Sequence, residues 1–189
     1  MNHKYSLKPP SPDLLNELTN IVGHSYVLRE GDPNQSRYLK EWRDRYIGRS
    51  ELILRPSNSA EISAILKRCN EEHVGVVPQS GNTGLVGGQI PHESGTEIVI
   101  SLDRMTKIKN LDLIGKSIEV EAGVTLAATQ QAALSSDLLL PLSIASEGSA
   151  CIGGNLATNV GGSSVVAYGS IRHLTLGLEV VLADGRIWS

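Results

Sequence analysis

The chain contains no phenylalanine, and its aromatic residues make up only 4% of 189 residues. A core without many large rings is aliphatic and depends on close packing of the backbone, for which 19 glycines are well suited. No excess of positive charge is present either, because 17 basic and 20 acidic residues give a formal net charge of -3. Basic residues gather between Arg37 and Arg49, but acidic residues lie among them. We therefore expect no nucleic-acid binding.

Cysteine is scarce, and Cys69 and Cys151 lack the spacing of a metal or redox motif. We expect both to be reduced thiols. No apolar run approaches the roughly 18 residues that a membrane helix needs, and residues 1–5 lead into prolines rather than into the apolar core of a signal peptide. The sequence therefore predicts a cytoplasmic protein without a transmembrane segment. The five histidines have no metal-ligand spacing, so we predict no metal site.

The first half of the chain carries helical and strand patterns. Ser11 followed by Pro12 predicts the start of a helix that ends at Gly23. Residues 24–50, called the arm, show no clear periodicity, and we interpret the arm as an irregular segment that packs on the rest of the molecule.

A strand, a helix and a second strand follow within a short stretch. We expect strands at 51–55 and 74–77, and between them a helix that begins with the capping box of Asn58 and Glu61. Such a unit is a right-handed crossover with parallel strands. A third strand is expected at 97–102.

The pattern of connections changes near Asp103, after which hairpins replace the crossover. The elements expected there are a hairpin of 107–113 and 117–121, a helix after Thr125 that continues to Leu134, a single helical turn at 155–158, and a strand from Leu174 to Leu182 that turns back into 186–188.

Two glycine-rich segments carry the strongest functional signal. The first, residues 78–88, directly follows the strand at 74–77, where ligands of parallel sheets bind. Glycine has no Cβ to keep a ligand from the backbone, so such a loop can turn its N–H groups toward a phosphate or pyrophosphate. The second, residues 147–164, combines glycine with small hydroxyl and amide side chains, which suit a large polar ligand of little charge. Together they favour a nucleotide cofactor over plain turns.

The spacing of these glycines disfavours two common nucleotide sites. Gly81, Gly84, Gly87 and Gly88 give G-x-x-G-x-x-G-G instead of the dinucleotide fingerprint G-x-G-x-x-G. The glycines between 148 and 154 lack the lysine of a Walker loop. A nicotinamide or nucleoside-phosphate binder on a doubly wound sheet is therefore the weakest of three hypotheses.

Several ordered motifs carry a resemblance to a known family. They lie at 78–88, 145–148, 152–162, 168–169 and 176–185, with an entry segment from Tyr38 to Pro56. Together they resemble the FAD-binding half of the D-2-hydroxy acid dehydrogenase family, which includes D-lactate and D-2-hydroxyglutarate dehydrogenases. This half is a PCMH-type domain, also called the vanillyl-alcohol-oxidase type. The match covers nearly the whole chain from about Tyr38.

The resemblance implies an α+β fold, with a small parallel β-α-β lobe and a second lobe of helices and a mainly antiparallel sheet. We expect an N-terminal helix and arm at 1–50, a first FAD-binding lobe at 51–102 that includes the pyrophosphate loop, and a second FAD-binding lobe at 103–189 that is incomplete at its C-terminus.

The resemblance also implies FAD as the cofactor. We expect it to be noncovalent, because Asn82 stands where relatives with covalent flavin usually have a histidine. Cys151 lies beside the expected flavin site, and we interpret it as a small buried thiol rather than as a tether. The expected cofactor-binding residues are Pro78, Gln79, Ser80, Gly81, Asn82, Thr83, Gly84, Leu85 and Val86 around the pyrophosphate, Pro141, Ser146, Gly148, Ser149, Ile152, Gly153, Gly154, Asn155, Thr158, Asn159 and Gly162 around the flavin and ribityl chain, and Val180 and Val181 near the adenine.

The expected reaction is hydride transfer from a D-2-hydroxy acid to FAD. In the family a C-terminal domain supplies the site for this small-molecule substrate, and we expect the chain without that domain to be inactive. No catalytic base is identified. The alternative is a non-catalytic FAD-domain module that needs a partner chain, and a homo-oligomer is left open.

Overall fold

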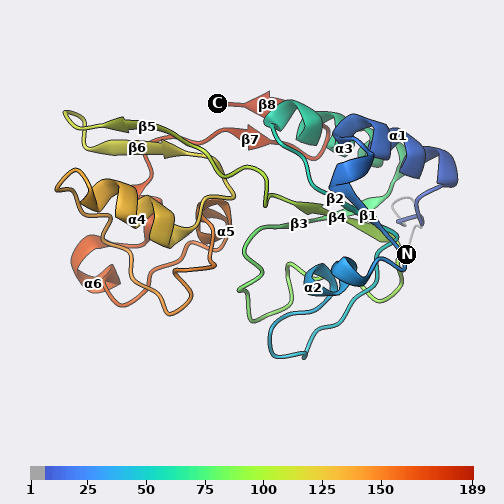
Figure 1. Cartoon of the computed structure of the whole chain (residues 1–189), viewed down its shortest axis with the longest axis horizontal. Helices are drawn as coiled ribbons and strands as arrows, with labels where there is room; N and C mark the ends of the chain where they lie inside the picture. The colour runs from blue at the N-terminus through green and yellow to red at the C-terminus, as the bar shows by residue number, and fades with distance from the viewer. Residues whose placement is uncertain (1–6) are drawn as a thin grey trace, which may run out of the picture.

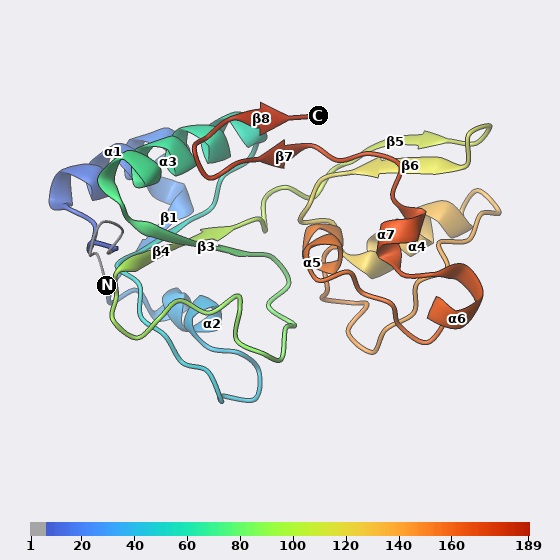
Figure 2. The ribbon, with the colours of Figure 1, turned by 180° about the vertical axis from the view of Figure 1, so that it is seen from behind.

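The computed structural model describes residues 7–189, which form two lobes that lie side by side (Figures 1 and 2). The first lobe holds a four-stranded sheet, and the second holds a two-stranded hairpin with several helices. None of the helices formed by residues 7–189 has the length and apolar character needed to cross a membrane.

The sheet of the first lobe has the strand order β1-β2-β4-β3. Its strands are β1 (Val27–Arg29), β2 (Leu52–Leu54), β3 (Gly75–Gln79) and β4 (Glu97–Ser101). Both β2 and β3 run parallel to β4, which lies between them, and Val99 of β4 pairs with Ile53 on one side and Val77 on the other. The parallel strands predicted from the sequence are therefore present, and β3 releases the first glycine segment at their carboxyl edge.

Two capped helices cover one face of this sheet, α1 (Pro12–Val22) and α3 (Ser59–Glu72). Ser11 accepts a hydrogen bond from the Leu14 N–H at 3.2 Å, and Asn58 accepts one from the Glu61 N–H at 2.9 Å, so both predicted caps are confirmed. The helices bury an aliphatic core against the sheet, formed by Leu14, Leu15, Leu18, Val22, Leu52, Leu54, Ile65, Cys69, Val74, Ile98 and Ile100.

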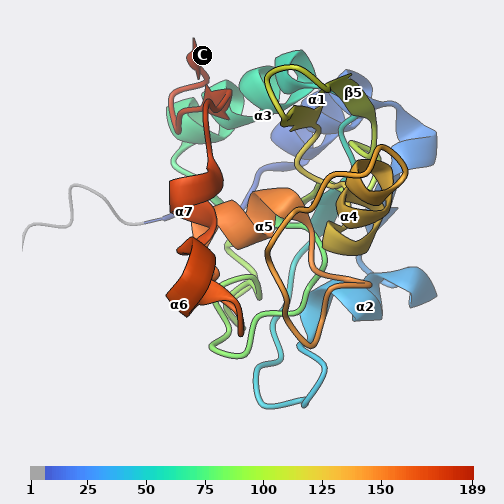
Figure 3. The ribbon, with the colours of Figure 1, turned by 90° about the vertical axis from the view of Figure 1, so that its left-hand side faces the viewer.

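The arm is more regular than its sequence suggested. It contains η1 (His24–Tyr26), β1, η2 (Pro33–Gln35) and α2 (Ser36–Leu39). Strand β1 pairs antiparallel with β2, so the expectation of an irregular segment was wrong. These elements have three or four residues each, too few for a periodic pattern to emerge. Figures 1 and 3 place α2 on the face of the sheet opposite α1 and α3, and there Tyr38 packs on Ile53 and Val99.

The second lobe begins with the predicted hairpin of β5 (Ile108–Asp112) and β6 (Ser117–Val120). Helix α4 (Leu126–Leu134) follows, capped by the Thr125 side chain as predicted. Helix α5 (Ile152–Ala157) begins three residues earlier than the helical turn expected at 155–158. Two short helices, α6 (Val165–Tyr168) and α7 (Ile171–Leu174), were not predicted. A small core of Leu126, Leu142 and Ile171 holds these helices together.

The final strand is much shorter than predicted. Leu174 ends α7, and the strand expected from Leu174 to Leu182 is reduced to β7 (Val180–Val181). It pairs antiparallel with β8 (Ile187–Trp188), which confirms the terminal hairpin. Within residues 7–189 no strand pairs with 175–179, and an extended segment without a ladder partner is not a strand. The hairpin lies against α3, where the Ser63 hydroxyl donates to the Gly185 carbonyl. The lobe boundary near Asp103 stays a prediction.

Candidate functional site

The two glycine segments meet where the lobes adjoin. A Cβ on Gly81 would lie 1.9 Å from the Ser149 carbonyl oxygen, and a Cβ on Gly154 would lie 2.9 Å from the Ser80 hydroxyl oxygen. Real Cβ atoms do not approach so closely, so only glycine permits this contact. The structure therefore brings together residues that lie about seventy positions apart in the sequence.

The backbone of the first glycine segment is available to a ligand. No backbone N–H group from Ser80 to Gln89 donates a hydrogen bond to any acceptor within residues 7–189. Backbone donors in an open loop bind anions well, because several of them converge without a side chain between them. Gly88 has open space where a side chain would lie. This part of the site therefore suits a phosphate or diphosphate group.

Several side chains of the first segment are bonded to the protein itself. The Asn82 amide donates to the carbonyls of Arg37 at 3.0 Å and Lys40 at 2.9 Å. The Gln79 amide, which is buried, donates to the carbonyls of Tyr38 and Gln89, both at 2.9 Å. The side chains of Asn82 and Gln79 thus hold the loop in place, and the contact of these two residues with the cofactor stays a prediction.

The other predicted residues of this segment are spread along the loop. Pro78 is exposed on β3, opposite Ile100 of β4. A Cβ on Gly84 would lie 2.6 Å from the side-chain oxygen of Gln89. Leu85 and Val86 expose large parts of their side chains.

The second glycine segment offers side chains as well as backbone. Asn155 is only 3% exposed, and its Nδ2 has no hydrogen-bond partner among residues 7–189. A buried donor without a partner is costly, so this amide is suited to a ligand acceptor. Thr158 donates to the Gly154 carbonyl at 2.9 Å, and Asn159 accepts from the Arg172 N–H at 3.3 Å. Thr158 and Asn159 therefore shape the segment.

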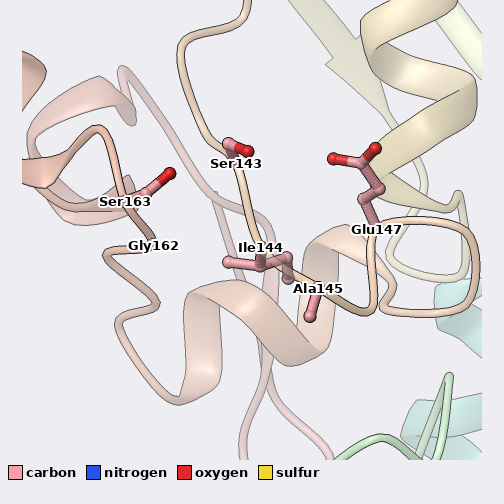
Figure 4. Close-up of a pocket in the computed structure, with 6 residues that line it drawn as sticks. All are labelled: Ser143, Ile144, Ala145, Glu147, Gly162 and Ser163. Carbon is pink, nitrogen blue, oxygen red and sulfur yellow. The ribbon is translucent and has the colours of Figure 1, made fainter.

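A hollow of about 550 Å³ lies beside this segment (Figure 4). The oxygens of Ser143 and Glu147 point toward one another across it in the picture. A Cβ on Gly162 would lie 2.1 Å from the Ser143 carbonyl oxygen, so glycine keeps the two sides of the hollow close. The lining residues are Ser143, Ile144, Ala145, Glu147, Gly162 and Ser163.

The remaining predicted residues of the second segment contact other parts of the protein or face solvent, and their contact with the cofactor stays a prediction. Ser146 accepts backbone bonds from Ser149 and Ala150, Ile152 packs on the core of the second lobe, and a Cβ on Gly153 would lie 2.7 Å from Ala122. Gly148 faces open space, and Pro141 is half-buried.

The Cys151 thiol is buried at this meeting point. Burial raises the pKa of Cys151, and the charge of Asp103 acts in the same direction, while a hydrogen bond with Ser80 acts against them. The thiol is therefore more firmly protonated than a free cysteine, and a protonated thiol is a poor nucleophile.

A polar network at the junction of the lobes was missed by the sequence reasoning. Asp103 lies two residues after the end of β4, and its carboxylate accepts from the Tyr38 hydroxyl at 2.7 Å and from Arg55 Nε at 3.0 Å. Burial raises the pKa of Tyr38, and the bond to Asp103 adds to that rise. The guanidinium of Arg104 lies 3.2 Å above the Tyr26 ring. A charged residue at the carboxyl end of a buried strand was the signal that could have pointed to this network.

Val180 and Val181 lie apart from the first glycine segment. They form β7 beside α3, whereas the first glycine segment runs on the α2 side of the sheet (Figures 1 and 3). Their contact with adenine stays a prediction. Among residues 7–189 no group of three or more histidine, cysteine, aspartate or glutamate side chains is placed to hold a metal ion.

A protein-family model matches most of the chain. The model of the FAD binding domain family covers residues 50–189. It includes both glycine segments and leaves out most of the arm.

Several curated proteins are similar in sequence. The chain is 42% identical over 168 residues to a protein of Oryza sativa subsp. indica named probable D-2-hydroxyglutarate dehydrogenase, mitochondrial, which covers 89% of this chain and 30% of that protein. It is 41% identical over 147 residues to the mitochondrial D-2-hydroxyglutarate dehydrogenase of Danio rerio, which covers 78% of this chain and 27% of that protein. The chain thus spans less than a third of the length of these relatives.

Solved structures share the fold at low sequence identity. An alkyldihydroxyacetonephosphate synthase superposes with a TM-score of 0.80 at 19% identity, over 98% of this chain and 36% of that chain. The p-cresol methylhydroxylase with substrate bound superposes with a TM-score of 0.73 at 21% identity, over 97% of this chain and 37% of that chain. The α+β architecture predicted from the sequence is confirmed by these likenesses and by the four-stranded sheet with its separate antiparallel hairpins.

Proposed function

The chain belongs to the FAD binding domain family, and on that premise we propose that it is the flavin-binding part of a dehydrogenase that oxidises a D-2-hydroxy acid. FAD, which the sequence predicted, is the ligand of this family. The relatives named D-2-hydroxyglutarate dehydrogenase support the class of substrate. The acid itself, D-2-hydroxyglutarate or D-lactate, is left to experiment.

The observation that carries the proposal is the unused row of backbone N–H groups from Ser80 to Gln89, beside the contact of Gly81 with Ser149. A diphosphate has the charge and the oxygens to accept several of these donors at once. The second segment offers the unpartnered Asn155 amide and a hollow lined by hydroxyl groups. The described residues therefore fit a ligand with a diphosphate at one end and a polar ring system at the other.

We assign the backbone from Ser80 to Gly84 to the diphosphate and the segment around Gly154 and Asn155 to the flavin and ribityl chain. Binding is noncovalent in this proposal, because Asn82 has no nucleophilic atom and Cys151 is held as a neutral thiol. FAD, when bound, accepts the hydride from the carbon that bears the hydroxyl group of the acid. The residues of this chain bind and orient the cofactor.

The relatives are about three times as long as the part that matches. We propose that the substrate and the base that removes its hydroxyl proton are held by the regions that such a protein has beyond the matched part. The chain of 189 residues then binds FAD but does not turn over a 2-hydroxy acid.

A titration tests the cofactor assignment. Apoprotein is mixed with FAD, and quenching of flavin fluorescence gives the dissociation constant, with thermal shifts for NAD and ATP measured in parallel. We expect saturable binding of FAD in the micromolar range and no shift with NAD or ATP. Denaturation should release all flavin. Absence of FAD binding, or tighter binding of NAD, contradicts the proposal, as does flavin that stays attached after denaturation.

A dye-reduction assay tests whether the substrate site and the base lie outside these 189 residues. D-lactate and D-2-hydroxyglutarate are added to the FAD-loaded chain with an artificial electron acceptor. We expect no turnover with either acid. Turnover would place the base and the substrate site within these 189 residues.

One observation favours a second candidate, a non-catalytic module that pairs with another chain. Leu176, Leu178 and Trp188 are exposed along the unpaired segment and the terminal hairpin. An unpaired extended segment invites a partner strand. Gel filtration over a range of concentrations separates a monomer from a paired form.

We also propose a cytoplasmic location, as the sequence suggested. The relatives from Oryza sativa and Danio rerio are named mitochondrial. Fractionation of cells that produce the protein distinguishes the two locations.

A further inference from the structure

The arm touches the first glycine segment at several points, yet most of it lies outside the part of the chain that matches the FAD binding domain family, which begins at residue 50. We propose that the arm is a positioning element of the cofactor site, with the buried carboxylate of Glu41 as its anchor. This inference rests on the proposed function and assigns a role to residues that the family match does not cover.

Three contacts join the arm to the loop. The Asn82 side chain donates to two arm carbonyls, those of Arg37 and Lys40. The guanidinium of Arg43 donates to the Leu85 carbonyl at 2.8 Å. The Tyr46 ring covers Gly87, where a Cβ would lie 2.7 Å from it and the backbone has φ +77°. The loop is thus held near its start, middle and end, and the backbone N–H groups are left free.

Glu41 holds the turn that presents these contacts. Its side chain is 0% exposed and accepts the N–H groups of Arg43 at 2.9 Å and Arg45 at 2.8 Å. Arg43 Nε lies 3.7 Å from the same carboxylate. Burial raises the pKa of Glu41, but these N–H donors and the two arginine charges outweigh it, so the pKa is lowered. An ionised carboxylate that is shielded from solvent depends on these hydrogen bonds and charges for its stability. The bonds of Glu41 therefore fix the backbone conformation of the turn.

The arm also reaches the junction of the lobes through Tyr38, whose hydroxyl donates to Asp103. The arm therefore contacts both the first glycine segment and the part of the chain that leads into the second lobe. Loops held in their binding shape lose less conformational entropy when the ligand arrives. The arm accordingly raises affinity for FAD without touching it.

Two variants test this role in the 189-residue chain. Glu41→Gln keeps the size of the side chain and removes its charge. Asn82→Gly removes the side chain that donates to the arm, and glycine accepts the φ of 49° found at Asn82 without strain. Glu72→Gln is the matched control, because Glu72 lies on α3 far along the chain from the arm and shares Arg68 with two other carboxylates.

Limited proteolysis of the apoprotein with thermolysin is the first readout, and fluorescence titration with FAD is the second. Cleavage requires the loop to leave its folded shape and enter the protease, so for both variants we expect cleavage at the exposed Leu85 and Val86 to become about tenfold faster, while β2 and β4 stay uncut. FAD affinity falls by about tenfold in parallel, and Glu72→Gln changes neither quantity.

The outcomes separate this inference from the proposed function. If folded variants are cleaved within 80–88 no faster than the unmodified chain, the positioning role is overturned, even if FAD binds. If cleavage of this loop becomes faster but the unmodified chain does not bind FAD, the arm positions the loop and the proposed function fails. Should Glu41→Gln unfold the whole chain, Asn82→Gly decides, because it leaves the buried carboxylate and its bonds intact.

Discussion

The two lobes contribute to the same site in different ways. The first lobe has a sheet whose central side chains, such as Ile53 and Ile98, have no exposure, and capped helices cover it. The second lobe has a much smaller core around Leu126 and short helices joined by long loops. The first glycine segment is held by other parts of its lobe and offers backbone donors, whereas the second is folded on itself and offers a buried amide. Glycine content alone does not distinguish these roles.

The largest expected effect tests the difference between the two cores. Leu54→Ala in the first lobe should lower the free energy of unfolding by about 3–5 kcal/mol, because a fully buried leucine leaves a cavity in a rigid sheet. Leu142→Ala in the second lobe should cost about 2 kcal/mol, because loops around a small core can collapse into the space. Urea denaturation measures the free energy of unfolding of both variants. Equal losses for the two would mean that the cores of the two lobes do not differ in this way.

The next prediction concerns the contact between the glycine segments. Gly81→Ala places a Cβ against the Ser149 carbonyl and should weaken FAD binding about a hundredfold, with a loss of about 2 kcal/mol in stability. Gly88→Ala is the matched control, since nothing lies within 4 Å of its added Cβ. Fluorescence titration of both variants measures the effect. Similar affinities for the two would mean that the contact does not shape the site.

A third variant should move stability and affinity in opposite directions. Asn155→Leu replaces a buried amide whose Nδ2 has no partner among the described residues. The apoprotein should be unchanged or up to about 1 kcal/mol more stable, because no donor is left unsatisfied. FAD affinity should fall about tenfold if the amide donates to the cofactor. Thermal unfolding with and without FAD separates the two effects, and loss of stability without loss of affinity would make Asn155 purely structural.

The smallest expected effect compares the two thiols. Burial raises the pKa of Cys69 to about 12 and raises that of Cys151 in the same direction. Alkylation by iodoacetamide should therefore be slower for both than for glutathione at pH 8, and should increase only at higher pH. Because the neutral thiol is favoured in the folded state, the related stability is complete below the ordinary thiol pKa and is lost as the pH rises above it. Peptide mapping measures each site, and fast modification of Cys151 at pH 7 would contradict this.

The family and the position of the two glycine segments were accessible from the sequence because their signals are local. The glycine spacing, the position after a buried strand and the order of several motifs identified the family, and the match over residues 50–189 confirms it. The roles of Asn82 and Gln79 were harder to predict. An amide in a glycine loop has the same local pattern whether it binds a ligand or an arm carbonyl more than forty residues away.

Local patterns in the sequence were enough to predict the capped helices α1, α3 and α4, the hairpin of β5 and β6 and the two glycine segments, because caps, periodicity and turn residues act over a few neighbouring positions. The folded chain was needed to show that β4 lies between β2 and β3, that β1 joins the sheet, and that Gly81 meets Ser149. These pairings join residues far apart in the chain, and they form where the whole core packs best rather than where any local pattern directs them.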